Sequence, residues 1–279
     1  MSESIVSTIG QNCKRCYSCI RECPAKAIRV VDGQAVVMYE RCIECGHCVK
    51  VCSQNAKKIK SDIDKVLNEI LPLENTVAIL APSFAASFPE ESGRLISALK
   101  YLGFARVCET AFGADLISGL YKELFDSNSQ NVIISSACPA VYNYIEKYYP
   151  ELVPNLAPIV SPMIAMGKYL RKQYGENLKV VFIGPCIAKK SEYGDDEVEN
   201  IIDAVLTFSE IKEILDKQKI DINKFEESFF DPPLSLYGKS FPLAGGLIKS
   251  ADLSNDILNR EIIIVEGKEK VIEIIDEIK

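Results

Sequence analysis

The sequence has little histidine, no tryptophan and no long apolar run. His47 is the only histidine, so the chain cannot build a metal site from several histidines. No apolar stretch reaches the roughly 18–20 residues that a membrane-spanning helix needs, and we therefore expect no membrane partner. No signal peptide precedes the first cysteine, which argues against an oxidising compartment and a disulfide framework.

The sequence is instead rich in cysteine. Eight of its eleven cysteines fall in two runs with the spacing C-x2-C-x2-C-x3-C. Bacterial two-cluster ferredoxins use this spacing to hold two [4Fe–4S] clusters, with the fourth cysteine of each run binding the other cluster. Zinc sites favour paired CxxC units instead. The spacing therefore predicts these ligands: Cys13, Cys16, Cys19 and Cys52 for cluster 1, and Cys42, Cys45, Cys48 and Cys23 for cluster 2.

The two cysteine runs form an internal repeat with a period of 29 residues, from Cys13 to Cys42. Between them, Asp32-Gly33 separates two short apolar segments and predicts a hairpin turn. Ser53 replaces the proline expected after Cys52, which removes local rigidity but no ligand. His47 lies between two predicted ligands, and we interpret it as a polar neighbour of the cluster.

Charge is unevenly distributed along the chain. The formal net charge is −7, yet residues 1–60 hold ten Lys/Arg against five Asp/Glu, while residues 61–279 hold 22 against 34. Lysines near an anionic four-thiolate cluster offset its charge, so the basic segment does not predict nucleic-acid binding. Eleven cysteines without a secretion signal predict a reducing cytoplasm.

The remainder of the chain alternates strand and helix signals. Residues 62–71 have helical apolar spacing and end at Pro72, which predicts a connector. From residue 76 onward the alternation predicts an α/β domain with parallel sheets flanked by helices. The strands are expected at 76–80, 104–108, 132–135, 179–183 and 261–265. Residues 218–258 are punctuated by Pro and Gly and predict a surface excursion.

Two further cysteines follow predicted strands. Cys138 comes after 132–135, and Cys186 comes after 179–183. Ligands gather at the carboxyl ends of parallel strands, so both thiols could face one crevice. The alternative is two buried free cysteines, a common fate of this residue. Cys108 lies within a predicted strand and is assigned to the core.

The sequences around these two cysteines carry a resemblance. Ser135-Ser-Ala-Cys138-Pro139 and Gly184-Pro-Cys186-Ile-Ala-Lys189-Lys190-Ser-Glu192 resemble the first two H-cluster motifs of the [FeFe]-hydrogenase large subunit. The likeness implies that Cys138 and Cys186 bind the cubane of an H-cluster. It also implies that Lys189 hydrogen-bonds a cyanide of the diiron unit and that Glu192 lies on the proton path. Without the family, an exposed first helical turn is the expected role of Lys189 and Glu192.

The resemblance implies three segments: a two-[4Fe–4S] ferredoxin-like α+β domain at 1–60, a helical connector at 61–75, and a hydrogenase-like α/β domain at 76–279. The third H-cluster motif, with two more cysteines, would begin near Lys279, so we expect the large domain to be C-terminally incomplete. Ala137 stands where catalytic members carry a proton-shuttling cysteine, and Gly184 stands where they carry methionine. Leu120 and Tyr121 replace expected acidic residues.

Ala137 and the segment 242–247 resemble the sensory branch of the family. We therefore expect an iron–sulfur electron-transfer protein that senses redox state or hydrogen. One alternative is an active hydrogenase once the third motif is supplied. Another is a ferredoxin-like carrier or iron–sulfur scaffold with an empty H-cluster site. A third [4Fe–4S] cluster or an H-cluster is left open, and the expected partners are a redox protein, such as a ferredoxin or oxidoreductase, and a downstream signalling module.

Overall fold

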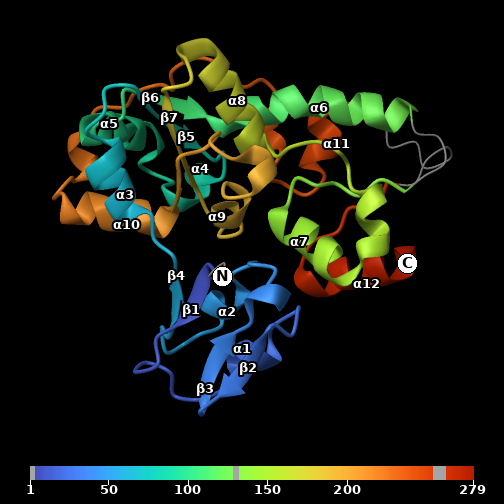
Figure 1. Ribbon diagram of the computed structural model, residues 1–279. Helices are drawn as coiled ribbons and strands as arrows, with labels where there is room; N and C mark the ends of the chain where they lie inside the picture. The colour runs from blue at the N-terminus through green and yellow to red at the C-terminus, as the bar shows by residue number, and fades with distance from the viewer. Residues whose placement is uncertain (1–3, 128–131, 254–261) are drawn as a thin grey trace.

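The computed structural model describes residues 4–127, 132–253 and 262–279. A small N-terminal domain, residues 4–60, lies below a larger domain that begins at residue 76 (Figure 1). Strand β1 pairs with β4 and β2 with β3, both antiparallel. The elements of the N-terminal domain are β1 (Val6–Thr8), α1 (Ser18–Arg21), β2 (Ile28–Val31), β3 (Gln34–Val37), η1 (Tyr39–Arg41), α2 (His47–Lys50) and β4 (Lys57–Ile59).

The N-terminal domain repeats itself in space as it does in sequence. The bounds of α2 are those of α1 moved by 29 residues. Left-handed backbone, which costs most non-glycine residues about 1–2 kcal/mol, occurs at three matched positions in each cysteine run. These pairs are Arg15 and Glu44, Tyr17 and Gly46, and Lys26 and Asn55. Such conformations persist where surrounding structure demands them, here in loops that turn the cysteines inward.

The predicted hairpin is confirmed, since Asp32 and Gly33 have φ values of 48° and 75° between β2 and β3. The connector is also helical, as α3 (Ile63–Lys65) and the π-helical turn η2 (Val66–Ile70). Its apolar side buries Ile63, Val66 and Ile70 against the core of the large domain. The connector therefore belongs to the packing of the large domain.

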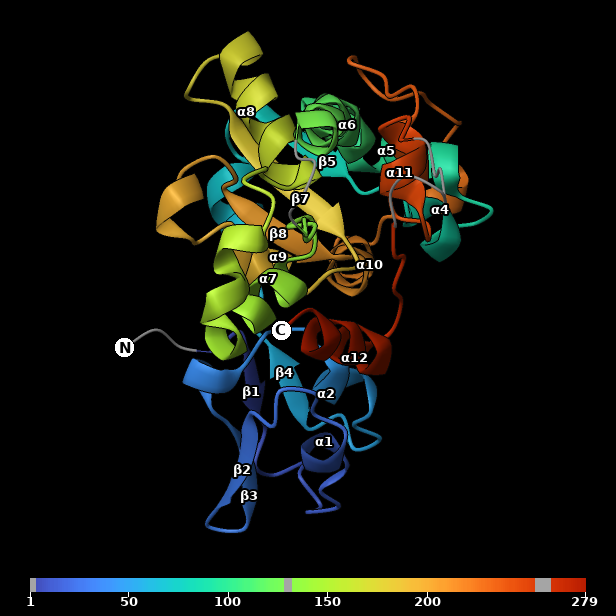
Figure 2. The same cartoon turned by 90° about the vertical axis from the view of Figure 1, so that its right-hand side faces the viewer.

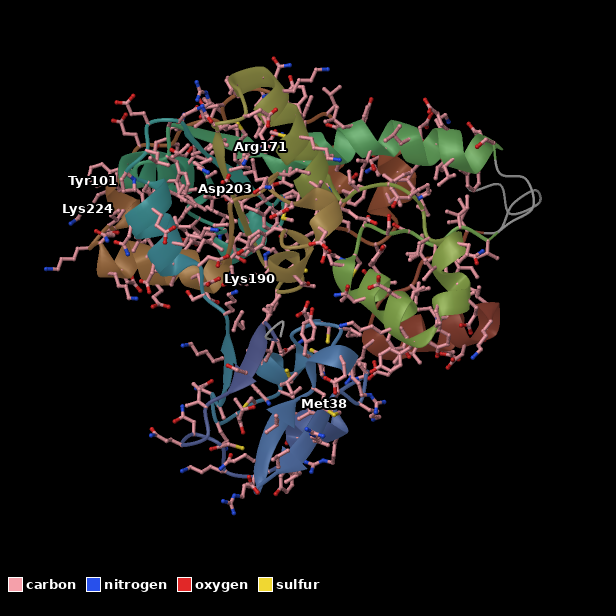
Figure 3. All side chains as sticks on the ribbon, viewed as in Figure 1. Met38, Tyr101, Arg171, Lys190, Asp203 and Lys224 are labelled. Carbon is pink, nitrogen blue, oxygen red and sulfur yellow. The ribbon has the colours of Figure 1, made fainter. Side chains whose placement is uncertain are left out.

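The large domain is built on a parallel sheet flanked by helices, as the sequence predicts. The strand order is β6 (Arg106–Glu109), β5 (Thr76–Leu80), β7 (Lys179–Gly184), β8 (Ala204–Thr207). Every residue of β5 and β8 is buried, and apart from one threonine in each these strands are apolar throughout. Arg171 and Asp203 form an ion pair of 2.7 Å beside this sheet (Figure 3).

The helices and turns of the large domain lie around the sheet or between the sheet and the N-terminal domain (Figures 1 and 2). They are α4 (Phe84–Ser87), α5 (Ser92–Leu102), α6 (Thr110–Ser127), α7 (Pro139–Tyr148), η3 (Pro150–Asn155), α8 (Pro162–Tyr174), α9 (Lys189–Glu192), η4 (Asp196–Val198), α10 (Phe208–Lys217), η5 (Ile222–Lys224), η6 (Gly238–Ser240), α11 (Gly246–Ser250) and α12 (Lys268–Ile278). Helices α6 and α8 approach closely where Gly113 faces the carbonyl of Pro162. No helix in the described part of the chain is long and apolar enough to cross a membrane.

Two expected strands are absent from the described residues. Segment 132–135 forms only an isolated parallel bridge, between Ile134 and Leu156, and does not join the sheet. The backbone of Ile134 is satisfied by Asn155 and Ala157 instead. Residues 262–265 are irregular, and residue 261 lies outside the described residues. Cys138 therefore does not follow a strand of the central sheet, which corrects that prediction.

The two domains share one apolar core. Ile28 and Ile43 of the N-terminal domain cluster with Tyr144 and Ile145 of α7 and with Ile275 of α12. Figure 2 shows α7 and α12 lying directly over the N-terminal domain. Polar contacts add to this packing. The Lys147 ammonium donates to the Cys42 carbonyl at 2.7 Å, and the Tyr148 hydroxyl donates to the carbonyls of Ala25 and Arg41 at 2.5 and 2.9 Å.

Candidate metal centres

The predicted ligands of cluster 1 line one cavity, which we call cavity 1. Its volume is about 340 Å³, including the part open to solvent. Cys13, Cys16, Cys19 and Cys52 all face it. Hydrogen bonds from the backbone and side chain of Ser18 lower the pKa of the Cys16 thiol. The backbone N–H of Ala56 donates to the Cys52 sulfur at 3.3 Å.

The predicted ligands of cluster 2 line a second cavity of the same size, cavity 2. Cys23, Cys42, Cys45 and Cys48 face it. The N–H groups of Ala27 and Glu44 donate to the sulfurs of Cys23 and Cys42 at 3.3 and 3.4 Å. Burial raises the pKa of the Cys48 thiol to about 12. Metal coordination deprotonates a thiol outright, so a bound cluster would overcome this cost.

The chemistry of both cavities fits a cluster better than a single ion. Four thiols surround each space, and backbone N–H groups point at their sulfurs. Within residues 4–127, 132–253 and 262–279, no group of three or more Cys, His, Asp or Glu is arranged to hold one metal ion. Four thiols could also bind zinc if they converged on one point, but here they stand around a space of about 340 Å³, which suits a [4Fe–4S] cluster.

Cys138 and Cys186 are within electrostatic reach of each other, and Cys138 also acts on Cys45 of cavity 2. Cys138 is exposed at the start of α7, and Cys186 is half-buried after β7. Burial raises the pKa of the Cys186 thiol, and the neighbouring Cys138 raises it further. The pKa of the Cys45 thiol is raised mainly by burial, then by Cys23, and to a smaller extent by Cys138. The second pair of thiols is thus within electrostatic reach despite the missing strand.

A direct contact joins this second site to cavity 2. Gly46, in the second cysteine run, packs so closely on Ile187 that a Cβ at residue 46 would overlap the Ile187 Cδ1. Gly46 also has φ 72°, which few side chains adopt readily. Its position, one residue from Cys45, places cavity 2 beside the loop that carries Cys186.

Lys189 and Glu192 are not on an exposed helical turn. Their side chains are 10% and 13% exposed and form an ion pair of 2.6 Å. The Lys189 ammonium opposes the burial-driven rise in the pKa of Cys186. The structure therefore overturns the expectation of an exposed turn and places this pair beside the Cys186 thiol.

Sequence reasoning missed the residues that hold α9 in place. The Lys190 ammonium is buried (labelled in Figure 3) and donates to Glu210 at 3.1 Å, with Asp62 3.6 Å away. Asp62 also accepts from the Val205 N–H at 3.0 Å. These carboxylates come from the connector and from α10, far from Lys190 in sequence. Only the unusual Lys189-Lys190 pair after a strand could have hinted at buried partners.

The departures from the family motifs have structural counterparts. A Cβ at Gly184 would meet the ring of Phe182 and the Cβ of Ala81, so methionine does not fit here without rearrangement. Tyr121, where an acidic residue was expected, places its hydroxyl 3.1 Å from Ser135 and 3.2 Å from Ser136. Ala137 offers no polar side-chain atom beside Cys138.

Acidic side chains gather near the second site. Partial burial raises the pKa of Asp195 to about 6, and Glu192, Glu146, Glu44 and Glu197 raise it further. Glu44 is 3% exposed, and its Oε1 has no hydrogen-bond partner. Carboxylates from both domains thus cluster around Asp195.

Two cysteine-lined cavities in the N-terminal domain, next to a domain with a parallel α/β sheet, define an iron–sulfur protein. Residues 5–53 match the 4Fe-4S dicluster domain, and residues 74–278 match the C-terminal domain of the iron only hydrogenase large subunit. The chain therefore belongs to the iron-only hydrogenase large-subunit family. The match covers most of the chain, including the sheet and both segments that carry Cys138 and Cys186.

Proteins similar in sequence to this chain include hydrogenases and an Fe-S cluster assembly factor. The chain is 31% identical to Iron hydrogenase 1 of Clostridium pasteurianum, over 69% of this chain and 38% of that protein. It is 28% identical to the NADP-reducing hydrogenase subunit HndD of Solidesulfovibrio fructosivorans, over 75% and 42%. It is 26% identical to a probable cytosolic Fe-S cluster assembly factor of Drosophila mojavensis, over 80% and 48%. The aligned region thus spans less than half of each relative.

Solved structures show the same fold. A variant of [FeFe]-hydrogenase HydA1 from Chlamydomonas reinhardtii superposes with a TM-score of 0.59 at 23% identity. The alignment covers 69% of this chain and 56% of that chain. At this identity the likeness establishes the fold of the large domain and nothing of its chemistry.

Proposed function

We propose that this chain is an iron–sulfur electron-transfer protein that senses redox state or hydrogen rather than turning hydrogen over rapidly. The observation that carries the proposal is the pair of matched cavities, each lined by one predicted set of four cysteines. Cluster 1 is assigned to Cys13, Cys16, Cys19 and Cys52, and cluster 2 to Cys42, Cys45, Cys48 and Cys23. Bound [4Fe–4S] clusters supply one-electron transfer, and the protein supplies their spacing and surroundings.

The position of cavity 2 supports a route between the domains. Gly46 and Ile187 are in contact, and the Cys45 and Cys138 thiols interact electrostatically. Electrons held at cluster 2 are thus adjacent to Cys138 and Cys186. We assign the opposite end, around exposed Cys16, to a redox partner protein, with a downstream signalling module as the reader of the second site.

The second site supports sensing over turnover. We assign Cys138 and Cys186 as partial ligands of a third cluster or H-cluster, and Lys189 as a hydrogen-bond donor toward it. Rapid hydrogen turnover needs a titratable relay within hydrogen-bond reach of the metal. Ala137 supplies none, although the buried Lys189–Glu192 pair lies close by.

Anaerobic reconstitution followed by iron and acid-labile sulfide analysis tests the assignment. We expect at least about eight irons per chain, four for each cluster. Cys16→Ala and Cys45→Ala should each lose one cluster. Cys108→Ala is the matched control, because Cys108 is buried in β6 far from both cavities. A wild-type protein with fewer than about four irons would contradict the proposal.

The same analysis decides the state of the second site. About twelve or more irons would support a third cluster at Cys138 and Cys186, whereas about eight would favour an electron carrier on a hydrogenase fold. Hydrogen evolution with a reduced dye should be absent in both wild type and Ala137→Cys. Turnover by that single variant would contradict the sensing role.

A further inference from the structure

The two cavities are copies of one another. Moving each of the twelve residues that line cavity 1 by the 29-residue period gives the corresponding position in the other half, and eleven of these line cavity 2. The twelfth, Ser18, maps to His47. The four thiols match in this way, as do Ala56 and Ala27. The ligand sets of the two sites are therefore equivalent, and any difference between them comes from the other lining residues.

Those other residues differ in polarity. Four polar positions in cavity 1 are apolar in cavity 2. The pairs are Thr8 and Val37, Lys14 and Ile43, Gln54 and Ala25, and Lys57 and Ile28. Glu44, the one carboxyl side chain among the lining residues, faces cavity 2, and its counterpart in the first half is Arg15. The lining of cavity 1 is thus more polar and more positively charged than the lining of cavity 2.

Lys57 is the least usual of these residues. It lies on β4 and is only 8% exposed. Its ammonium donates to the Thr8 hydroxyl at 2.6 Å and to the Ala35 carbonyl at 3.3 Å, and both acceptors line cavity 1. The position of the charge is therefore fixed at the wall of that cavity.

The Lys57 charge has no counter-ion in the part of the chain that the structure describes. Among the described residues, no carboxylate forms an ion pair with it, whereas the buried Lys189 and Lys190 both have acidic partners. Burial raises the pKa of Cys19 and of Cys48, and Lys57 opposes both effects. Its field thus reaches both cavities, although its contacts lie in cavity 1. A buried, unpaired cation is costly unless an anion is bound nearby.

Lys268 and Lys147 are cations outside the cavities that contact the half of the domain carrying cavity 2. Lys268 lies 2.9 Å from the His47 Nε2, and its charge is paired with Glu22. Lys147 has no such partner among the ion pairs of the described residues. Its ammonium donates to the carbonyls of Tyr39 and Cys42, at 3.3 and 2.7 Å. It is not among the residues that line cavity 2, and it belongs to the contact between α7 and the N-terminal domain. Lys147 therefore acts on cluster 2 from outside the cavity and with access to solvent.

We propose that Lys57 makes the two clusters unequal, so that the cluster in cavity 1 is reduced before the cluster in cavity 2. This inference rests on the proposed function. In the step, one electron passes from a one-electron donor, such as a reduced redox partner, to a cluster, and no bond forms or breaks. The added negative charge is stabilised by a nearby cation and by polar donors, which raises the reduction potential.

The order in which the two clusters are reduced decides when an electron can reach the second site, at Cys138 and Cys186. Helix α2 lies nearer the large domain than α1 does (Figure 2), and α1 contacts that domain through Glu22 at its C-terminal end, which pairs with Lys268 of α12. Cavity 2 is the one beside Ile187 and Cys186. A single electron therefore rests at cluster 1, remote from the second site. Cluster 2 is filled only when the donor is strong enough to add a second electron.

A redox titration followed by electron paramagnetic resonance tests the proposal on the reconstituted full chain. We expect two clusters with separate midpoint potentials in the wild type. Lys57→Ile should lower the reduced-to-oxidised ratio of cluster 1 about tenfold at the wild-type midpoint, which is about 59 mV for a one-electron couple. Cluster 2 should shift less. The signal that moves most should be lost in Cys16→Ala and kept in Cys45→Ala.

Matched variants separate charge from packing. Lys57→Arg should keep the wild-type order, and Lys58→Ile, an exposed neighbour on the same strand, should change neither potential. Should Lys57→Ile fail to fold, Lys57→Met removes the charge while keeping most of the length, with the same expected shift. Two bound clusters with equal shifts, or with none, would overturn this proposal alone. A wild-type protein without clusters would overturn the proposed function as well.

Discussion

The ammonium of Lys189 and the carboxylate of Glu192 lie 2.6 Å apart, with almost all of both side chains covered. The two residues are three positions apart, about one turn of α9, and the Lys189 ammonium acts electrostatically on the preceding Cys186 thiol. A cation and an anion buried together in this way stabilise each other only while both are present. The pair thus ties the stability of α9 to the chemistry at Cys186.

Glu192→Gln should leave the Lys189 ammonium buried without its partner. We expect a loss of about 3 kcal/mol in the free energy of unfolding, because removing one member of a buried pair strands the other. Chemical denaturation under anaerobic conditions measures it. Glu213→Gln is the matched control, since its 2.7 Å pair with Lys217 is about half exposed and should cost about 0.5 kcal/mol or less. Equal losses would contradict the burial argument.

Gly46→Ala should disturb the contact between the domains. The new Cβ would overlap Ile187, and overpacking of this kind costs about 1–3 kcal/mol. Tyr17, at the matched position of the repeat, adopts the same left-handed backbone, so a side chain can be held there at a cost of about 1–2 kcal/mol. Gly46→Ala/Ile187→Ala should therefore recover the part of the loss that comes from the overlap with Ile187. A double variant no better than Gly46→Ala would place the cost in the backbone.

Asp115→Ala should release the segment after residue 232. The Asp115 carboxylate accepts from the backbone N–H groups of Leu236, Tyr237 and Gly238, at 2.8, 3.0 and 2.6 Å. Losing these charge-assisted bonds should cost about 3 kcal/mol and speed proteolysis of the segment. Asp126→Ala, at the exposed end of the same helix, should do neither. Limited proteolysis with mass analysis of the fragments reads the difference.

Asp195→Asn should stabilise the protein at neutral pH. Partial burial and neighbouring carboxylates raise the folded-state pKa of Asp195 from 3.8 to about 6. The folded state therefore holds the proton more tightly, and stability falls as pH rises from about 4 to about 6. The variant should lack this fall and match the wild type below about pH 4. Denaturation midpoints between pH 4 and 8 test it, and identical pH profiles would contradict it.

The cysteine spacing carried most of what could be predicted. It grouped the same thiols that line cavity 1 and cavity 2, because a short repeat fixes which residues share a loop. The strand at 204–207 was missed, since three apolar residues and a threonine that run directly into α10 are too short a segment to be told from the start of that helix. The strand at 132–135 was wrong because apolar, β-branched residues show extended backbone without showing whether a partner strand is present.

Burial of charge was beyond sequence reasoning. Lys190 is neutralised by Asp62 and Glu210, which come from separate elements of the chain. A lysine pair after a strand looks like a solvated turn until the fold brings those carboxylates together. Lys57 was similarly indistinguishable from the other basic residues of the N-terminal domain. Lys57 lies in the wall of cavity 1 because of its position on β4, which the sequence did not reveal.

Each cavity in the N-terminal domain is closed by a cysteine borrowed from the other half: Cys52 completes cavity 1, and Cys23 completes cavity 2. Neither half of the repeat is therefore self-sufficient. A fragment ending between the halves would retain three thiols at one site and one at the other. Both halves of the repeat are therefore needed to form either site, and the two sites must be gained or lost together.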